Sequence, residues 1–221
     1  MAPETPKDFT LSPELHRYVL EHSQPVDALQ RRLIEATAAL GPIARMQIAP
    51  EQGAFMTLLT AALGASTVVE VGTFTGYSTL CLARGLAPGG RVLACDVSDE
   101  WTALGRRAWA AAGVADRIDL RIAPARETLA ALPATRHIDL AFVDADKPSY
   151  RDYLGELIPR MVPNGVILVD NVLWSGSVVD PAATDPDTEA IRACNAALAA
   201  DDRVDVVILP IADGLAFVRV H

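Results

Sequence analysis

The sequence has few cysteines, and none of them forms a Cys-x-x-Cys pair. The three cysteines among 221 residues lie far apart and are odd in number. This usage argues against a secreted disulfide scaffold and favours reduced thiols in a cytoplasmic protein. The first ten residues, MAPETPKDFT, also contain no apolar signal core. We therefore expect a cytoplasmic location.

Basic residues and long apolar spans are scarce as well. Lys and Arg total 19 against 28 Asp and Glu, so the net charge is -9. Such a chain lacks the basic surface that binds nucleic acid or anionic membranes, although it can hold a cation. The uncharged stretch 52–69 contains glycine, serine and threonine, so it is more typical of a buried helix and a strand than of a membrane span. We expect neither a nucleic-acid partner nor a membrane partner.

Apolar residues are abundant, at 51% of the chain, which excludes disorder over most of its length. Strands alternate with helices after a helical opening, a pattern that predicts an α/β fold with a doubly wound, mostly parallel sheet. The last two strands are close enough for a hairpin, which makes one strand antiparallel. The expected strands are 67–71, 91–96, 118–122, 137–144, 165–170, 204–209 and 215–220, and the expected helices between them are 78–84, 100–112, 150–161 and 187–200.

The opening of the chain contains helix signals and no strand pattern. Ser12 and Pro13 predict a helix start, and a second helix places Leu29, Leu33, Ala36 and Leu40 on one face before Gly41-Pro42 ends it. We expect residues 1–221 to form a single domain. About the first 45 residues would then be a helical cover or a dimer segment.

A glycine-rich turn follows the first strand and opens a helix. The turn runs Glu70-Val-Gly72-Thr-Phe74-Thr-Gly76, with Phe74 where a dinucleotide fingerprint needs its second glycine. Asp96 ends the next strand, where an acidic residue can accept hydrogen bonds from ribose hydroxyls. The combination favours a nucleoside without a pyrophosphate, such as S-adenosylmethionine. Alternatively, the glycines only allow a tight turn and the two acids are solvated.

Oxygen ligands follow two further strands. Asp144 ends one strand, and Asp170 with Asn171 ends the next. If the strands are neighbours, these side chains converge at one edge of the sheet and suit a hard divalent cation. Lys147 follows Asp144 by three residues and could act on an acceptor proton. Taken separately, the same residues could be an ion pair at a strand end and a helix cap.

Four segments, VVEVGTFTGYS, ACDVS, FVDADK and LVDNVLWSGSVV, together resemble the cation-dependent O-methyltransferases of the caffeoyl-CoA and catechol type. The resemblance runs from about Met46 to the C-terminus in the same order. DADK followed by DN is fairly specific to that family, whereas the opening helices match least. The resemblance implies a Rossmann-like fold of seven strands with an antiparallel last strand, S-adenosylmethionine as methyl donor, and a homodimer.

The resemblance also implies site residues. Asp144, Asp170 and Asn171 match the ligands of Mg²⁺ or of another divalent cation such as Mn²⁺ or Ca²⁺. Lys147 matches the lysine that catechol-type members use as a base, so Lys147 and Asp144 are the predicted catalytic residues. The predicted contacts to S-adenosylmethionine are the Ile48 backbone, Glu70, Gly72, Thr73, Ser78, Asp96 and Ala125.

The predicted reaction transfers a methyl group to one hydroxyl of a phenolic or catechol-like small molecule, with two vicinal hydroxyls on the cation. Trp174 would then wall the acceptor site. Three alternatives remain. A nicotinamide-dependent oxidoreductase is disfavoured by Phe74, and a nucleic-acid methyltransferase by the acidic charge. A non-catalytic nucleoside-binding module would not require a cation.

Overall fold

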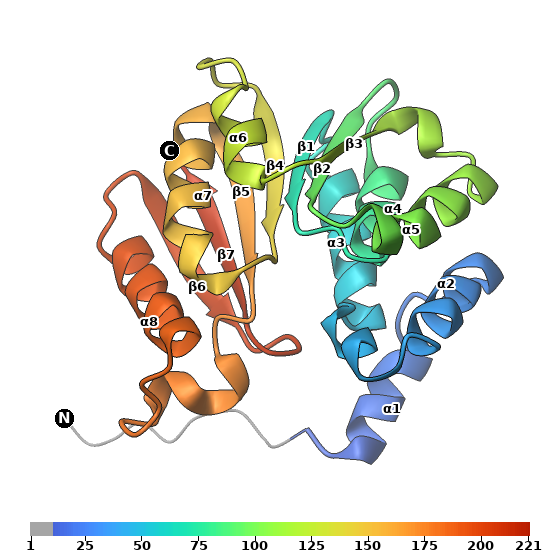
Figure 1. The fold of residues 1–221 in the computed structure, drawn as a ribbon, viewed down its shortest axis with the longest axis horizontal. Coiled ribbons are helices and arrows are strands. Elements are labelled where there is room, and N and C mark those ends of the chain that lie inside the picture. Colours follow the sequence, from blue (N-terminus) through green and yellow to red (C-terminus); the bar gives the residue numbers. More distant parts are fainter. Residues whose placement is uncertain (1–10) are drawn as a thin grey trace.

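A seven-stranded sheet runs through the middle of the molecule, with helices on both of its faces (Figure 1). The computed structural model describes residues 11–221. The sheet order is β3-β2-β1-β4-β5-β7-β6, and β7 alone runs opposite to the other six strands. The predicted fold class is confirmed. The strands are β1 (Thr67–Val71), β2 (Arg91–Asp96), β3 (Ile118–Ile122), β4 (Ile138–Val143), β5 (Met161–Asp170), β6 (Val204–Leu209) and β7 (Leu215–Val220).

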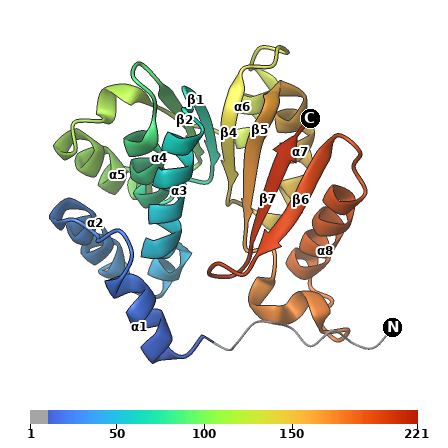
Figure 2. The ribbon, with the colours of Figure 1, turned by 180° about the vertical axis from the view of Figure 1, so that it is seen from behind.

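Helices cover the sheet in two groups, which the front and back views show on opposite sides (Figures 1 and 2). Val68 and its neighbours on one face pack against α2 to α5, while Val69 and Val71 belong to the core formed with α6 to α8. This alternation follows from the two-residue period of a strand. The helices are α1 (Pro13–Glu21), α2 (Ala28–Ala38), α3 (Pro50–Ala62), α4 (Tyr77–Gly85), α5 (Asp99–Ala111), α6 (Ala125–Ala130), α7 (Tyr150–Leu157) and α8 (Pro186–Ala199).

Short 3₁₀ helices join several of these elements, and one of them corrects a predicted boundary. The helix expected over 150–161 ends at Leu157, and β5 already begins at Met161. Pro159, within the short turn Ile158–Arg160, cannot continue the α-helical hydrogen bonds. The 3₁₀ helices are η1 (Gly41–Met46), η2 (Ala115–Arg117), η3 (Lys147–Ser149), η4 (Ile158–Arg160) and η5 (Trp174–Val179).

The N-terminal helices form as the sequence predicts. The Ser12 side chain accepts a hydrogen bond from the Leu15 amide and caps α1. Helix α1 buries none of its residues, and the His16 ring contacts the Glu51 carboxylate on α3 at 2.9 Å. On α2, Leu33 is buried in the core, whereas Leu40 is exposed beyond the end of the helix. Within residues 11–221, no helix has the length and apolar character needed to cross a membrane.

The order of the sheet reverses beside β1, and the turns after β1 and β4 touch there. Gly72 has a φ of +92°, and a Cβ atom at this position would lie 1.8 Å from the Asp144 carbonyl oxygen. Only glycine allows both the backbone conformation and the close approach. Ligands of such sheets bind at this reversal, beyond the carboxyl ends of the strands.

Candidate active site

A cavity of about 1150 Å³ lies at the carboxyl ends of the central strands. Its walls come from the turns after β1, β2, β4 and β5, from the segment before α3, and from the turn between β6 and β7. One predicted site residue, Glu70, is not part of this wall. The predicted residues that line it are Ile48, Gly72, Thr73, Ser78, Asp96, Ala125, Asp144, Lys147, Asp170 and Asn171.

Asp96 supports the glycine turn from the end of β2. Its Oδ2 accepts hydrogen bonds from the backbone amides of Thr73 at 3.0 Å and Phe74 at 2.7 Å. Its Oδ1 accepts from the Ser98 amide at 2.8 Å. Asp96 is therefore more than a solvated strand end: it fixes the turn while its carboxylate faces the cavity. Oδ1 therefore retains acceptor capacity for a ligand hydroxyl, whereas Oδ2 already accepts two hydrogen bonds.

Glu70 lies directly behind this turn and is fully buried. Its Oε2 accepts hydrogen bonds from the hydroxyls of Thr73 and Thr79, whereas Oε1 has no partner among the described residues. Burial raises the pKa of Glu70 to about 7, against the opposing effect of the hydroxyl donors. A buried carboxylate with a free oxygen is suited to a cationic ligand group.

The remaining predicted cofactor residues border the same part of the cavity. Ile48 lies between η1 and α3, Ser78 is in the first turn of α4, and Ala125 begins α6. All three are buried. The cavity therefore combines polar groups around the glycine turn with a mainly apolar wall, which is the usual character of a small-molecule or cofactor site.

Three oxygen-bearing side chains meet where β4 and β5 end. Val143 pairs with Val169 in parallel register. Asp144 and Asp170 are the next residues after this pair, so they come at the same level of neighbouring strands. Asp170 Oδ1 accepts a hydrogen bond from the Asn171 amide at 2.9 Å. Asn171 has a φ of +57°, a left-handed conformation that asparagine tolerates better than most residues. The parallel pairing thus brings the three predicted ligands together.

The charges of this group fit a divalent cation. Burial, followed by the charge of Asp144, raises the pKa of Asp170 to about 7, and burial also raises the pKa of Asp144. A cation would relieve this repulsion, and two carboxylates with one amide oxygen are hard ligands that suit Mg²⁺ or Mn²⁺. Within residues 11–221, no cluster of three or more His, Cys, Asp or Glu side chains could hold a metal. A cation held by Asp144 and Asp170 would therefore need the amide oxygen of Asn171 as its third protein ligand.

Lys147 lies between two of these ligands. Its Nζ donates to Asp144 Oδ1 at 3.0 Å and to Asn171 Oδ1 at 2.7 Å. Nζ also lies 5.6 Å from the centre of the Trp174 ring, and only 7% of the residue is exposed. The structure thus brings the predicted base, Lys147, and the predicted wall residue, Trp174, to the same place.

Sequence reasoning missed two residues of this site. The Tyr150 hydroxyl contacts Lys147 Nζ at 2.6 Å and donates to the Asp170 carbonyl oxygen at 3.1 Å. Its position one helical turn after Lys147 was the available signal. Gln52 lines the cavity from α3, is fully buried, and has no hydrogen-bond partner for either side-chain polar atom among the described residues. No sequence pattern marks such an amide.

The family model for O-methyltransferases matches residues 20–221. The chain belongs to the O-methyltransferase family. This membership makes it an enzyme and decides against the oxidoreductase and the non-catalytic module. The matched range begins inside α1, so it includes every wall of the cavity.

Individual relatives of this O-methyltransferase cover nearly its whole length. A probable caffeoyl-CoA O-methyltransferase from Dictyostelium discoideum is 39% identical over 91% of the chain and 89% of the relative. A caffeoyl-CoA O-methyltransferase from Zea mays is 37% identical over 96% of the chain and 85% of the relative. The crystal structure of an O-methyltransferase from Bacillus cereus in complex with SAH matches with a TM-score of 0.85 and 31% identity, over 94% and 97% of the two chains.

Proposed function

We propose that the enzyme transfers a methyl group from S-adenosylmethionine to one hydroxyl of a vicinal diol on an aromatic small molecule, with the help of a divalent cation. The observation that carries this proposal is the sharing of one cavity by the glycine turn with Asp96 and the oxygen set of Asp144, Asp170 and Asn171. A methyl donor and a chelated acceptor bound in these two places would lie side by side.

The donor is assigned to the turn after β1. Asp96 would accept hydrogen bonds from the ribose hydroxyls, and Ala125 would pack against the adenine. The backbone at Ile48 would face the methionine part, whereas Glu70, buried behind the turn, would act on the positive charge of the donor through its carboxylate without lining the cavity. The Bacillus cereus relative, described in complex with SAH, supports this assignment.

The cation is assigned to Asp144, Asp170 and Asn171. Bound there, a divalent cation would lower the pKa of a chelated hydroxyl and would leave most of its other positions to water and substrate. A vicinal diol offers two oxygens to that cation, whereas a monophenol offers one. The caffeoyl-CoA O-methyltransferases among the relatives support a substrate of the caffeoyl type.

Lys147 handles the acceptor proton in this proposal. Its Nζ, held by Asp144, Asn171 and the Tyr150 hydroxyl, is the basic group nearest the cation set. It would take the proton of the reacting hydroxyl or hold the resulting phenolate. The oxygen would then attack the methyl carbon in line while the carbon–sulfur bond breaks, and the electron pair of that bond would neutralise the sulfonium. Catalysis depends mainly on alignment and on formation of the oxyanion.

The proposal is tested with labelled S-adenosylmethionine and a panel of catechols, caffeoyl-CoA and monophenols, each with and without EDTA. We expect methylation of vicinal diols only, and loss of activity in EDTA that Mg²⁺ or Mn²⁺ restores. Asp170→Ala should lose activity by orders of magnitude and still bind S-adenosylmethionine. Asp152→Ala, an exposed carboxylate on α7, is the matched control. Full activity in EDTA would refute the cation mechanism.

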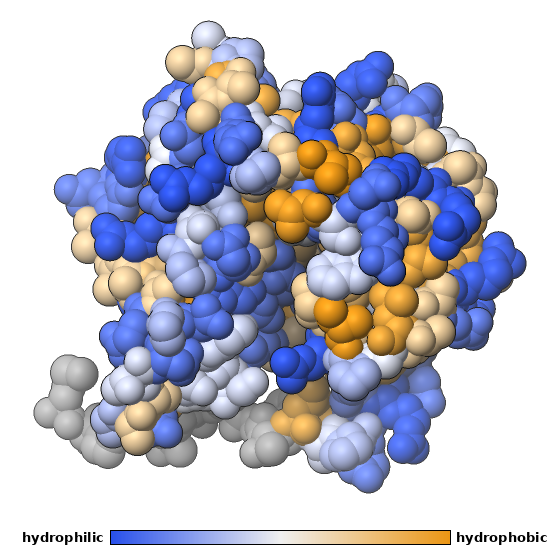
Figure 3. Space-filling view, viewed as in Figure 1, coloured by the Kyte–Doolittle hydropathy of each residue, from blue (hydrophilic) through white to orange (hydrophobic). Residues whose placement is uncertain are grey.

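We further propose that residues 1–221 act as one methyltransferase domain and that the enzyme is a cytoplasmic homodimer. Residues 1–10 lie outside the described part of the chain. In the remainder of the N-terminal segment, Leu11, Leu15 and Tyr18 are all more than 40% exposed, which leaves apolar surface for a partner. Apolar groups are also exposed on the side of α4 and α5, whereas the surface over α7 and α8 is more hydrophilic (Figure 3). The three buried, unbridged cysteines agree with a reducing compartment.

A further inference from the structure

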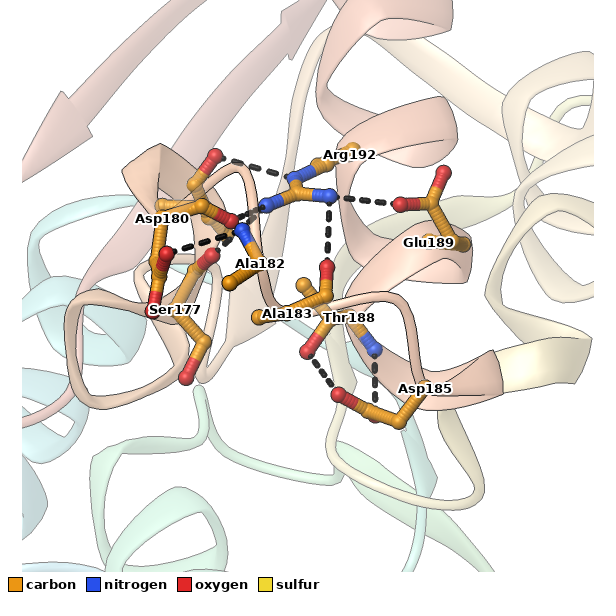
Figure 4. A network of polar contacts seen from close by, with 9 residues as sticks. Ser177, Asp180, Ala182, Ala183, Asp185, Thr188, Glu189 and Arg192 are labelled. Carbon is orange, nitrogen blue, oxygen red and sulfur yellow. Dashed lines mark hydrogen bonds and ion pairs between the residues drawn. The ribbon is translucent and has the colours of Figure 1, made fainter.

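Helix α8 directs one side chain, Arg192, into the segment that follows Asn171 (Figure 4). A guanidinium has five N–H donors and no acceptor, and here every donor is used. Arg192 Nε donates to the Val178 carbonyl at 3.0 Å, and Nη1 donates to the Ala183 carbonyl at 2.8 Å. The full set of acceptors comprises the carbonyl oxygens of Ser177, Val178, Asp180 and Ala183 and the carboxylate of Glu189.

The same segment is held from its other side by the turn between β6 and β7. The Asp213 side chain accepts from the Ser175 amide at 2.6 Å, and its carbonyl accepts from the Leu173 amide at 3.0 Å. Helix α8 adds a second contact, from the Asn195 side-chain amide to the Val172 carbonyl at 2.9 Å. Residues 172–183, which we call the acceptor wall, therefore lie between two sets of hydrogen bonds.

The acceptor wall contains a short run of left-handed backbone. Trp174, Ser175 and Gly176 are three consecutive residues with φ between +47° and +86°. The first two carry side chains, for which this left-handed conformation is unfavourable. Trp174, Ser175 and Ser177 all line the cavity, and Trp174 lies over Lys147. The hydrogen bonds thus hold a strained backbone in the place where an acceptor would contact it.

We propose that Arg192 is a positioning residue for the methyl acceptor: it acts through the acceptor wall and touches neither acceptor nor donor. The inference rests on the proposed function, because it assigns the acceptor to the part of the cavity beside Trp174. Lysine has three donors at one point and cannot reach four carbonyl groups in a fork. The acceptor site therefore depends on arginine at this position.

The test compares Arg192→Met and Arg192→Lys with a matched control, Arg160→Met. Arg160 also donates to carbonyl oxygens and to a carboxylate, on Glu156 and Leu132, but it does not line the cavity. Hydrogen exchange over 172–183, affinity for SAH, and kcat and KM with caffeoyl-CoA are measured in each variant. For Arg192→Met we expect faster exchange in this range and a fall in kcat/KM of roughly 10- to 100-fold, mainly through KM. Affinity for SAH should stay unchanged.

Arg192→Lys should recover part of the loss, and Arg160→Met should leave both exchange over 172–183 and KM unchanged. Unchanged exchange or unchanged KM in Arg192→Met would overturn the inference, and so would an equal rise of KM in Arg160→Met. If the wild type methylates no vicinal diol, the proposed function fails. Exchange over 172–183 then still decides whether Arg192 holds the wall.

Discussion

Single residues of the site divide into those that touch reacting groups and those that set the electrostatics around them. In the proposed mechanism Lys147 belongs to the first kind, and its ammonium is held by three oxygen atoms. Lys147→Ala should lower kcat by roughly 10²- to 10⁴-fold, the range for a positioned proton-transfer group. The loss should shrink at high pH, where the phenol ionises unaided.

A kcat profile against pH measures this effect, with Lys147→Arg beside the alanine variant. Arginine keeps the positive charge but cannot accept a proton. If Lys147→Arg is as inactive as Lys147→Ala, Lys147 acts as a base. If Lys147→Arg retains most of the rate, the positive charge of Lys147 stabilises the phenolate. An alanine variant with wild-type kcat at neutral pH would exclude both roles.

Glu70 belongs to the second kind, and its burial predicts a pH-dependent stability. Because the pKa of the folded-state carboxyl is raised from 4.5 to about 7, the folded protein holds this proton more tightly than the unfolded chain. The contribution of Glu70 is therefore most favourable below pH 4.5 and is lost as the pH rises from 4.5 to 7. The shift corresponds to about 3 kcal/mol of unfolding free energy.

Glu70→Gln should flatten the pH dependence of the unfolding free energy in that window. Urea unfolding without cofactor, at several pH values, measures the difference in slope between variant and wild type. Glu127→Gln on α6 removes an exposed carboxylate and provides the baseline. Parallel curves for Glu70→Gln and wild type would show that Glu70 is ionised in both states.

At the scale of elements, the contact between the turns after β1 and β4 predicts an unusual cost at Gly72. Gly72→Ala would place a Cβ atom against the Asp144 carbonyl oxygen at a φ of +92°. We expect a loss of about 4 kcal/mol or more of unfolding free energy, since a Cβ atom so close to a backbone oxygen forces one of the two turns to shift. Gly89→Ala is the matched control, because Gly89 has a φ of +80° but open space around it.

Gly89→Ala should lower the unfolding free energy by only about 1 kcal/mol, the cost of a positive φ for alanine. Chemical unfolding of both variants therefore separates the steric clash at Gly72 from this backbone cost. Equal costs would mean that the two turns move apart freely. If Gly72→Ala fails to fold while Gly89→Ala folds, the result still agrees with the expected order.

The elements also show how far the sequence could predict the structure. The strands could be predicted as continuous apolar runs that end in Glu or Asp, because both faces of a parallel sheet are buried. The short helix α6 was missed, since its six residues give too few turns for a periodic pattern. The acceptor wall was unpredictable for another reason: it is hydrogen-bonded to Arg192 and Asp213, which lie outside the segment and leave no pattern within it.

At the scale of the whole molecule, the apolar residues left exposed on α1 predict a homodimer. Light scattering at micromolar concentration should give twice the monomer mass. The paired substitutions Leu15→Glu and Tyr18→Glu should shift the mass to that of the monomer, because charge on this face opposes association. Arg17→Glu, on the same helix, is the control for added negative charge. A monomeric mass for the wild type would contradict the prediction, and α1 would then serve only as a helical cover within its own chain.

Because the strand order reverses beside β1, the proposed donor site and the proposed acceptor site are built from two separate stretches of sequence. The proposed donor residues run from Ile48 to Ala125, and the proposed acceptor residues run from Asp144 to Asp213. Between them lies the mostly exposed connection 131–137, none of whose residues lines the cavity. Recombination at that connection would exchange the choice of acceptor between related enzymes while the donor site passes unchanged. Acceptor range in such a lineage could then change by exchange of one half of the gene.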